Sequence, residues 1–315
     1  MPYWWTALVY KALSLSCVPL FVMLSGVLLL QPAKLDEPIR VFLKKRLSRI
    51  GLAFVFWSMV YLAWGFYIYK VPVTLDNIAQ GIVKDLFTGA WYHFWFIYLI
   101  IGLYLITPIL RVIIAYGNPR ITRYLIALWF AGVAVLPLIQ LGFGYMLDVG
   151  VFVLGGFIGY FVLGNYLQKI TLKNTLLIGL LVASFVGTVL GTYLMTYHFG
   201  GLMQSNYFLD YLTVNVIVGS VALYLLLLKA NPDWPGTNNP LRPLVQAISN
   251  NTLPLFLFHI IIIETFQRGL IGFTISYTTL NPIVEIPLLA ALTFFVTLGL
   301  VLLMRRVPVL RKLIG

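Results

Sequence analysis

The chain is short of charged residues and of cysteine. Only 10% of its 315 residues are charged while 61% are hydrophobic, which leaves too few polar residues to cover a soluble globule of this size. Its single cysteine, Cys17, excludes an internal disulfide and a metal site built from several cysteines. These shortages exclude most soluble enzymes and predict a protein that lies in a lipid bilayer.

Motifs of soluble enzymes are also missing. The sequence has no Gly-rich phosphate loop, no His-Glu-x-x-His and no Gly-x-Ser-x-Gly. It lacks a Pro/Ser-rich linker and a low-complexity block as well, so residues 1–315 are predicted to form a single integral-membrane domain. We expect no metal site and no bound cofactor.

Long apolar runs are what the chain has instead. A helix of about 20 apolar residues crosses a hydrocarbon layer of ~30 Å, and these runs lack the alternating pattern of a membrane barrel. The predicted fold class is therefore all-α, a polytopic helical membrane protein with about nine transmembrane helices. The predicted spans are 8–30, 50–69, 94–114, 124–141, 149–167, 176–197, 208–228, 253–273 and 283–304.

The basic residues fall mainly on alternate sides of these spans. Of the 21 Lys and Arg, 17 lie in one set of connections, and the other set holds only Lys11, Lys70, Lys84 and Arg268. Because cytoplasmic loops are enriched in Lys and Arg, this split predicts an N-terminus outside the cell and a cytoplasmic C-terminus. The same bias explains the net charge of +12 without a nucleic-acid partner.

Polar groups at membrane depth are the candidates for chemistry, because each is costly there. His93 is expected at the outer mouth of the third span, His198 at the outer end of the sixth, and His259 roughly 9 Å inside the cytoplasmic end of the eighth. For each histidine, a packing role is the alternative. Several carboxylates are expected on the outer half, where they could bind sugar hydroxyls or act as caps: Asp76, Asp85, Asp148, Asp210, Glu264 and Glu285.

Small residues recur every four positions in the fifth and sixth spans. Such stripes permit close contact between helices, so they are interpreted as packing surfaces rather than ligand sites. Their members are Gly155 and Gly159 in the fifth span, and Gly179, Ala183, Gly187 and Gly191 in the sixth.

Four stretches resemble a known family in their order and spacing. They are CVPLFVMLSGVLLL (17–30), FLKKRLSRIGLAFVFW (42–57), HFWFIYLIIGLYLITPILR (93–111) and TLPLFLFHIIIIE (252–264). Together they resemble membrane acyltransferase family three, the bacterial inner-membrane O-acyltransferases of surface polysaccharides, and within it the WecH-like branch. The resemblance implies that an acyl group, expected to be acetyl, passes from cytoplasmic acyl-CoA to a hydroxyl of a cell-surface glycan or its lipid-linked precursor.

The resemblance also suggests a donor site. Lys45, Arg46 and Arg49 match the family's basic cytoplasmic patch, where cations would bind the phosphates of coenzyme A. A plain topology signal is the alternative reading of these cations. Ser25 and Gly26 match the family's Ser-Gly pair beside that patch, where a close backbone approach or a local helix break is expected.

Other positions match the family's third and penultimate spans. Trp95 and Tyr104 belong to an aromatic motif that also includes Pro108, and they are expected to line the site. His93 lies just ahead of this motif, and His259 matches a histidine that the family often has, so these two are the candidate catalytic residues. Asp148, Asp210 and Glu264 are the candidates on the acceptor side.

The chain departs from the family in two places. The better known branch has an acidic residue in the third span, where this chain has Ile100 and Ile101. The family also has ten core spans, of which the first carries the expected catalytic histidine. Residues 1–11 are predicted to form the loop after that span, so the chain is expected to lack it. A transporter or flippase of a lipid-linked sugar and a non-catalytic membrane subunit are the alternative functions.

Overall fold

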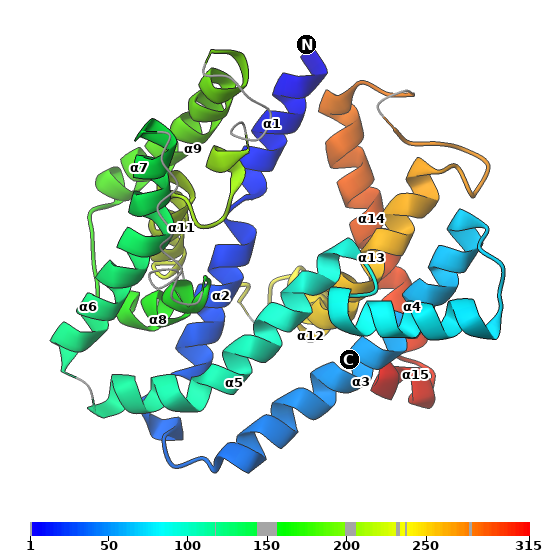
Figure 1. Ribbon diagram of the computed structural model, residues 1–315, viewed down its shortest axis with the longest axis horizontal. Helices are drawn as coiled ribbons and strands as arrows, with labels where there is room; N and C mark the ends of the chain where they lie inside the picture. The colour runs from blue at the N-terminus through cyan, green and yellow to red at the C-terminus, as the bar shows by residue number, and fades with distance from the viewer. Residues whose placement is uncertain are drawn as a thin grey trace. The chain divides into compact units, whose positions relative to one another are not determined.

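The computed structural model describes residues 2–116, 118–143, 156–198, 206–230, 234–236, 238–276 and 279–315. Every regular element in these ranges is helical (Figure 1), which confirms the predicted all-α class. Within the described ranges, 7 helical segments are long and apolar enough to cross a membrane, and a bent pair of helices raises the number to 8. The chain is therefore a multi-pass membrane protein.

The chain forms two compact units, each built from two separate stretches. Residues 1–37 and 105–232 form the first unit, and residues 38–104 and 233–315 form the second. One helix, α5 (Trp95–Tyr116), continues from the second unit into the first. The prediction of a single domain stays a prediction.

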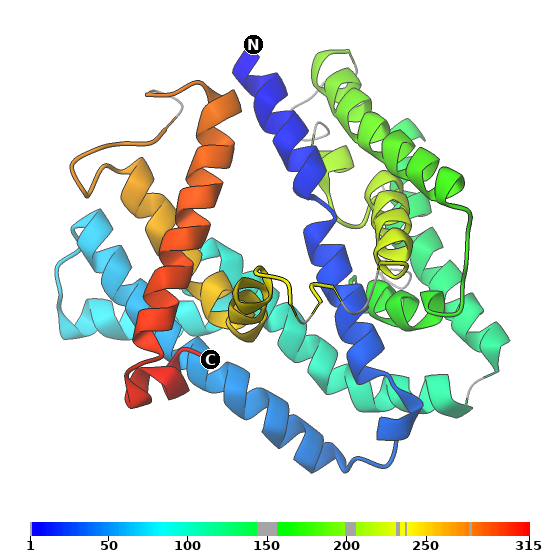
Figure 2. The same cartoon turned by 180° about the vertical axis from the view of Figure 1, so that it is seen from behind.

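In the first unit, α2 packs against α8, and α9 packs against α11; both pairs can be followed in Figure 1 and, from behind, in Figure 2. Its described elements, besides the end of α5, are α1 (Pro2–Ser14), α2 (Cys17–Leu29), η1 (Pro32–Lys34), α6 (Pro119–Phe130), the π-helical turn η3 (Ala131–Val135), α7 (Leu136–Phe143), α8 (Ile158–Leu167), α9 (Asn174–Tyr197), η4 (Tyr207–Leu209) and α11 (Val214–Leu227).

The loop predicted for residues 1–11 is wrong, because α1 is a helix from residue 2 onward. The aromatic residues of α1 pack against α9, which the sequence alone does not reveal. Trp4 packs edge-on against Tyr197, and Trp5 stacks on Tyr193. With α2 it makes one candidate span of 27 residues. The predicted span 149–167 is described only from residue 156, where α8 has 10 residues.

Glycine allows α2 and α8 to approach closely. A Cβ built on Gly26 would collide with the Phe161 carbonyl, and a Cβ built on Gly164 would collide with the backbone of Met23. The close approach predicted at Gly26 is therefore confirmed. The helix itself is continuous there, so the alternative of a local break at the Ser25–Gly26 pair is wrong.

The predicted packing stripe of α9 is largely wrong. A Cβ on Gly179 or Gly187 would meet nothing within 4 Å, and only Gly191 lies close to a neighbour, the Phe208 ring. The contact with α11 is made instead by a polar residue of α9, Ser184. Ser184 donates to the Asn215 carbonyl (2.6 Å), and such hydroxyls hold apolar helices together where the hydrophobic effect is absent.

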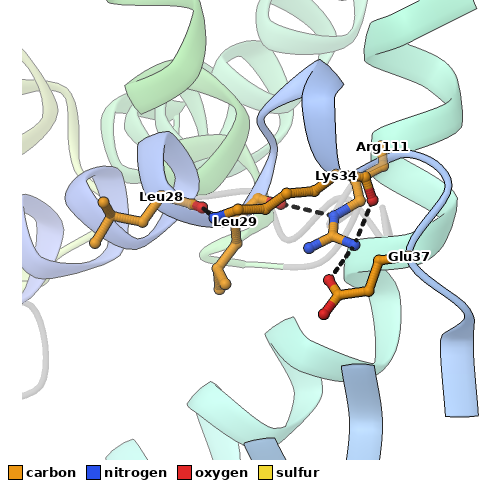
Figure 3. A network of polar contacts seen from close by, with 5 residues as sticks. All are labelled: Leu28, Leu29, Lys34, Glu37 and Arg111. Atoms are coloured by element: carbon orange, nitrogen blue, oxygen red, sulfur yellow. Dashed lines mark hydrogen bonds and ion pairs between the residues drawn. The ribbon is translucent and has the colours of Figure 1, made fainter. Parts of the chain in front are cut away.

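An arginine closes the C-terminal end of α2. Arg111 of α5, 4% exposed, donates from Nε to the Leu29 carbonyl (2.7 Å) and from Nη1 to the Lys34 carbonyl (2.9 Å) and the Glu37 carboxylate (3.0 Å), while the Lys34 ammonium donates to the Leu28 carbonyl (Figure 3). The last carbonyls of a helix have no partner within it, and a cation there is favoured by the helix dipole. Arg111, one of the 17 basic residues on the predicted cytoplasmic side, therefore also has a structural role.

The second unit contains α3 (Ile39–Tyr69), α4 (Leu75–Thr88), η2 (Tyr92–Phe94), the start of α5, α12 (Arg242–Asn250), α13 (Thr252–Gln267), α14 (Pro282–Met304) and α15 (Pro308–Leu313). Here α13 packs against α14 and α3, and α15 packs against α3 (Figure 2). The helix α3 has 31 residues, or about 46 Å of rise, so one end must project beyond a ~30 Å hydrocarbon layer. Its basic residues from 40 to 49 identify that end.

The helices α3 and α13 run side by side in the same direction. Trp57 packs against Phe258 (ring centroids 5.0 Å), the Tyr61 hydroxyl donates to the Leu257 carbonyl (2.7 Å), and one turn further the Trp64 indole donates to the Glu264 carboxylate (2.9 Å). Between α12 and α13 the chain bends by 83°. The bend therefore separates α12 from α13, which begins at Thr252.

Candidate functional site

Two histidines from different helices meet inside the second unit. His93 of η2 and His259 of α13 have ring centroids 5.6 Å apart. His93 is 6% exposed and is surrounded by aromatic rings, with those of Tyr61, Phe94 and Phe256 at 5.2, 4.9 and 5.4 Å. The structure thus brings together the two residues predicted to be catalytic.

Hydrogen bonding distinguishes the two rings. His259 Nδ1 lies 2.6 Å from the Phe256 carbonyl, which can only accept, so Nδ1 carries the proton and Nε2 of the neutral ring is left as an acceptor. The Leu257 carbonyl, which accepts the Tyr61 hydroxyl, also lies beside the His93 ring. Neither ring nitrogen of His93 makes a hydrogen bond of good geometry in the described chain. A buried group of this kind is costly and is available to a ligand.

The two predicted depths of these histidines are not compatible with each other. His93 was expected at the outer mouth of its span, and His259 near the cytoplasmic end of another. The 5.6 Å between the rings places them at one level of the second unit. His93 lies in η2, directly before α5, and His259 lies seven positions after Thr252, the first residue of α13.

An aromatic cluster surrounds the Glu264 carboxylate, five residues beyond His259 and about 7.5 Å along α13. Trp64 donates to its Oε2 (2.9 Å) and Trp91 to its Oε1 (3.0 Å), and Arg268 forms an ion pair with Oε2 at 3.7 Å. Trp91 also stacks on Tyr69, whose ring lies under the Arg268 guanidinium. We call the side chains of Trp64, Tyr69, Trp91, Glu264 and Arg268 the aromatic end of the site.

The cations predicted for the donor lie at the other end of the unit. Arg46 and Arg49 share one face of α3, and both are close enough to the Tyr104 hydroxyl for their charges to act on it. From Arg49 to Tyr61 the helix rises by about 18 Å. Arg46 is half-buried, and its Nε has no hydrogen-bond partner in the described ranges. Lys45 precedes Arg49 by four positions, so it lies on the same side of α3, and both side chains are exposed.

The remaining predicted residues lie elsewhere. Ser25 and Gly26 belong to the first unit, where Ser25 donates to the Phe21 carbonyl (2.8 Å), so their part in a donor site stays a prediction. Asp210 is also in the first unit and accepts the Leu212 amide (2.8 Å), as a capping carboxylate does. Asp148 lies outside the described residues.

Of the two predicted lining residues, neither has a described ring contact with the histidines. Trp95 is 40% exposed and packs edge-on against Phe96, while Tyr104 packs against Phe42 near the donor cations. Tyr61, Trp64 and Trp91 occupy the positions expected of lining residues. The spacing of Trp57, Tyr61 and Trp64, one turn apart along α3, is the signal that could have identified them from sequence.

The helices and the site define a multi-pass membrane protein with a buried histidine pair between a cationic end and an aromatic end. A family model described as an acyltransferase domain, that of acyltransferase family 3, matches residues 1–303. Because the match covers nearly the whole chain, the protein belongs to this family and is an acyltransferase. Neither the curated proteins nor the solved structures give a match to it.

Proposed function

We propose that the protein transfers an acetyl group from acyl-CoA to a hydroxyl of a cell-surface glycan or its lipid-linked precursor, as an O-acyltransferase of the bacterial cytoplasmic membrane. Family membership shows acyl transfer in general. The donor, the acceptor and the orientation, with the N-terminus outside and the C-terminus cytoplasmic, are our proposal. The observation that carries it is the buried pair of His93 and His259 in the second unit.

Histidine suits this reaction because a hydroxyl is a weak nucleophile until a base takes its proton. His259 Nε2 accepts the proton of the acceptor hydroxyl while the oxygen attacks the thioester carbonyl. A C–O bond forms, the C–S bond breaks, and the departing thiolate of coenzyme A takes the proton that His259 had accepted, which restores the base. The products are an O-acyl ester and the free thiol, so atoms and charges balance without a further reagent. His93, facing His259, holds the hydroxyl or the leaving sulfur.

The two ends of the unit suit two different substrates. Guanidinium groups bind phosphate oxygens through paired hydrogen bonds, so Arg46 and Arg49 would hold the phosphates of acyl-CoA, with Tyr104 beside them. Glu264, fixed by two indoles, offers an oriented carboxylate to sugar hydroxyls, and the flat rings of Tyr69 and Trp91 offer a surface for a sugar. The histidine pair lies between these ends.

Replacement of each histidine tests this assignment. In the purified protein, reconstituted in lipid nanodiscs, His259→Ala is expected to lower kcat for acetyl transfer about 100-fold or more, the usual contribution of a general base. The dissociation constant of acetyl-CoA should stay the same, because the phosphate-binding cations are untouched. His198→Ala, an exposed histidine at the end of α9, is the matched control and should retain full activity.

A kcat for both His93→Ala and His259→Ala within about twofold of the unaltered protein would remove the pair from catalysis, since a base contributes far more than that. Equal losses in kcat and in acetyl-CoA affinity would instead indicate that these residues maintain the fold of the unit.

A further inference from the structure

The C-terminal segment of the chain is fixed against α3 one turn from Arg49. A Cβ built on Gly315 would lie 3.4 Å from the Cβ of Ala53, and the Trp57 indole donates to the Ile314 carbonyl (3.4 Å). Ile314 is 0% exposed and Trp57 is 1% exposed, so this contact is part of the core of the second unit. Since Ala53 follows Arg49 by four positions, the two share one face of α3.

Arg305, directly after α14, is held at this place. Its Nη2 donates to the Gly315 main-chain oxygen and to the Asn250 carbonyl, both at 3.0 Å, which fixes the guanidinium between Gly315 and the last residue of α12. Its Nε is buried and has no hydrogen-bond partner in the described part of the chain. The Nε of Arg46 is in the same condition. Two unpartnered guanidinium nitrogens are costly unless an acceptor from outside reaches them.

Arg305 lies close to two other cations, Arg49 and Arg311. Burial lowers the pKa of Arg305 below its usual value, and the nearby charges of Arg49 and Arg311 lower it further. The only ion pairs in the described ranges are Arg111 with Glu37 and Arg268 with Glu264, so none of these three arginines is paired with an acidic residue there. Like charges brought together in this way repel each other, and a bound anion removes the repulsion.

We propose that Arg305 and Arg311 form, with Arg46 and Arg49, one site for a phosphate group of the acyl-CoA donor, so that the C-terminal segment is part of the donor site. The inference rests on the proposed function. Arg305 and Arg311 both follow residue 303, where the match to the family model ends. An anionic lipid carries the same phosphate chemistry at the same membrane surface, and the experiment separates the two sources.

The experiment compares neighbouring arginines of the full-length protein. Binding of coenzyme A is measured in nanodiscs of phosphatidylcholine alone, together with the thermal stability of each variant. Arg305→Gln is expected to weaken coenzyme A binding about tenfold or more, as loss of a charge-assisted phosphate contact does, and Arg49→Gln to do the same. Arg306→Gln is the matched control, because it removes the same charge from the adjacent exposed residue and should leave binding unchanged.

Charge and geometry are separated by Arg305→Lys. This substitution keeps the positive charge but removes the planar guanidinium group, so it should recover only part of the coenzyme A affinity that is lost in Arg305→Gln. Equal affinities of Arg305→Gln and Arg306→Gln would overturn the inference while leaving the donor assignment of Arg46 and Arg49 intact. A second set of nanodiscs contains phosphatidylglycerol, an anionic lipid, and the thermal stability of each variant is compared between the two sets. An Arg305→Gln variant that binds coenzyme A normally but is no longer stabilised by phosphatidylglycerol would also overturn the inference. If the unaltered protein binds no coenzyme A, the proposed donor itself fails.

Discussion

The polar residues inside the apolar bundle differ in whether other groups of the protein form hydrogen bonds with them. Arg111 donates hydrogen bonds to several fixed acceptors, and Glu264 accepts hydrogen bonds from two indoles. The burial of both charges is therefore compensated locally. His93 is buried to a similar degree, but its ring nitrogens lack such partners in the described chain. This contrast separates residues that hold the structure together from a residue that is available to substrate.

At the same scale, Glu264 allows a test of the acceptor. Glu264→Gln keeps the size of the side chain, but its amide cannot accept from both Trp64 and Trp91, and the ion pair with Arg268 is lost. We expect the KM for a soluble glycan acceptor to rise about tenfold or more, with the affinity for acetyl-CoA unchanged. Asp36→Asn, an exposed carboxylate of the first unit, is the control for loss of one negative charge. A rise in the KM for acetyl-CoA alone would reverse the assignment of the two ends.

At the scale of helices, backbone contact between α2 and α8 depends on glycine. An added Cβ at Gly26 or Gly164 would enter the backbone of the opposite helix, whereas one at Gly179 of α9 would meet nothing within 4 Å. The sequence shows small residues at all three positions, and only the packing distinguishes them.

Replacement by alanine should therefore destabilise the protein at Gly26 and Gly164 but not at Gly179. Gly26→Ala and Gly164→Ala are expected to lower the free energy of unfolding by about 1–3 kcal/mol or more, as overpacking does. Gly179→Ala should be neutral or raise it by up to about 1 kcal/mol, because alanine favours a helix over glycine. Unfolding of the protein in detergent, followed by tryptophan fluorescence, measures the three. An equal loss for Gly179→Ala would contradict the described packing.

At the scale of the whole molecule, much of the architecture could be predicted from apolar run length and composition. Those features predict helices and a multi-pass membrane protein, and the family resemblance predicts the histidines and the donor cations. The meeting of His93 with His259 could not be predicted, because helices that are apolar on all sides give no signal of which face packs inward.

The arrangement of α3 and α13 brings together residues of the second unit that lie far apart in the sequence. One helix, α3, carries Arg49 near one end and Trp64 near the other, about 22 Å of rise apart, and α13 runs beside it with His259 in between. A donor and an acceptor bound at opposite ends could then meet at the histidine pair.

Acetyl transfer by the purified protein tests the central claim most directly. The protein in nanodiscs is incubated with radiolabelled acetyl-CoA and a lipid-linked glycan, and label in the glycan is measured before and after treatment with hydroxylamine, which cleaves esters. We expect ester-linked label with the unaltered protein and, for His259→Ala, about 1% of that rate or less with unchanged acetyl-CoA binding. Absence of label from the glycan despite bound acetyl-CoA, or equal labelling by His259→Ala, would contradict the account.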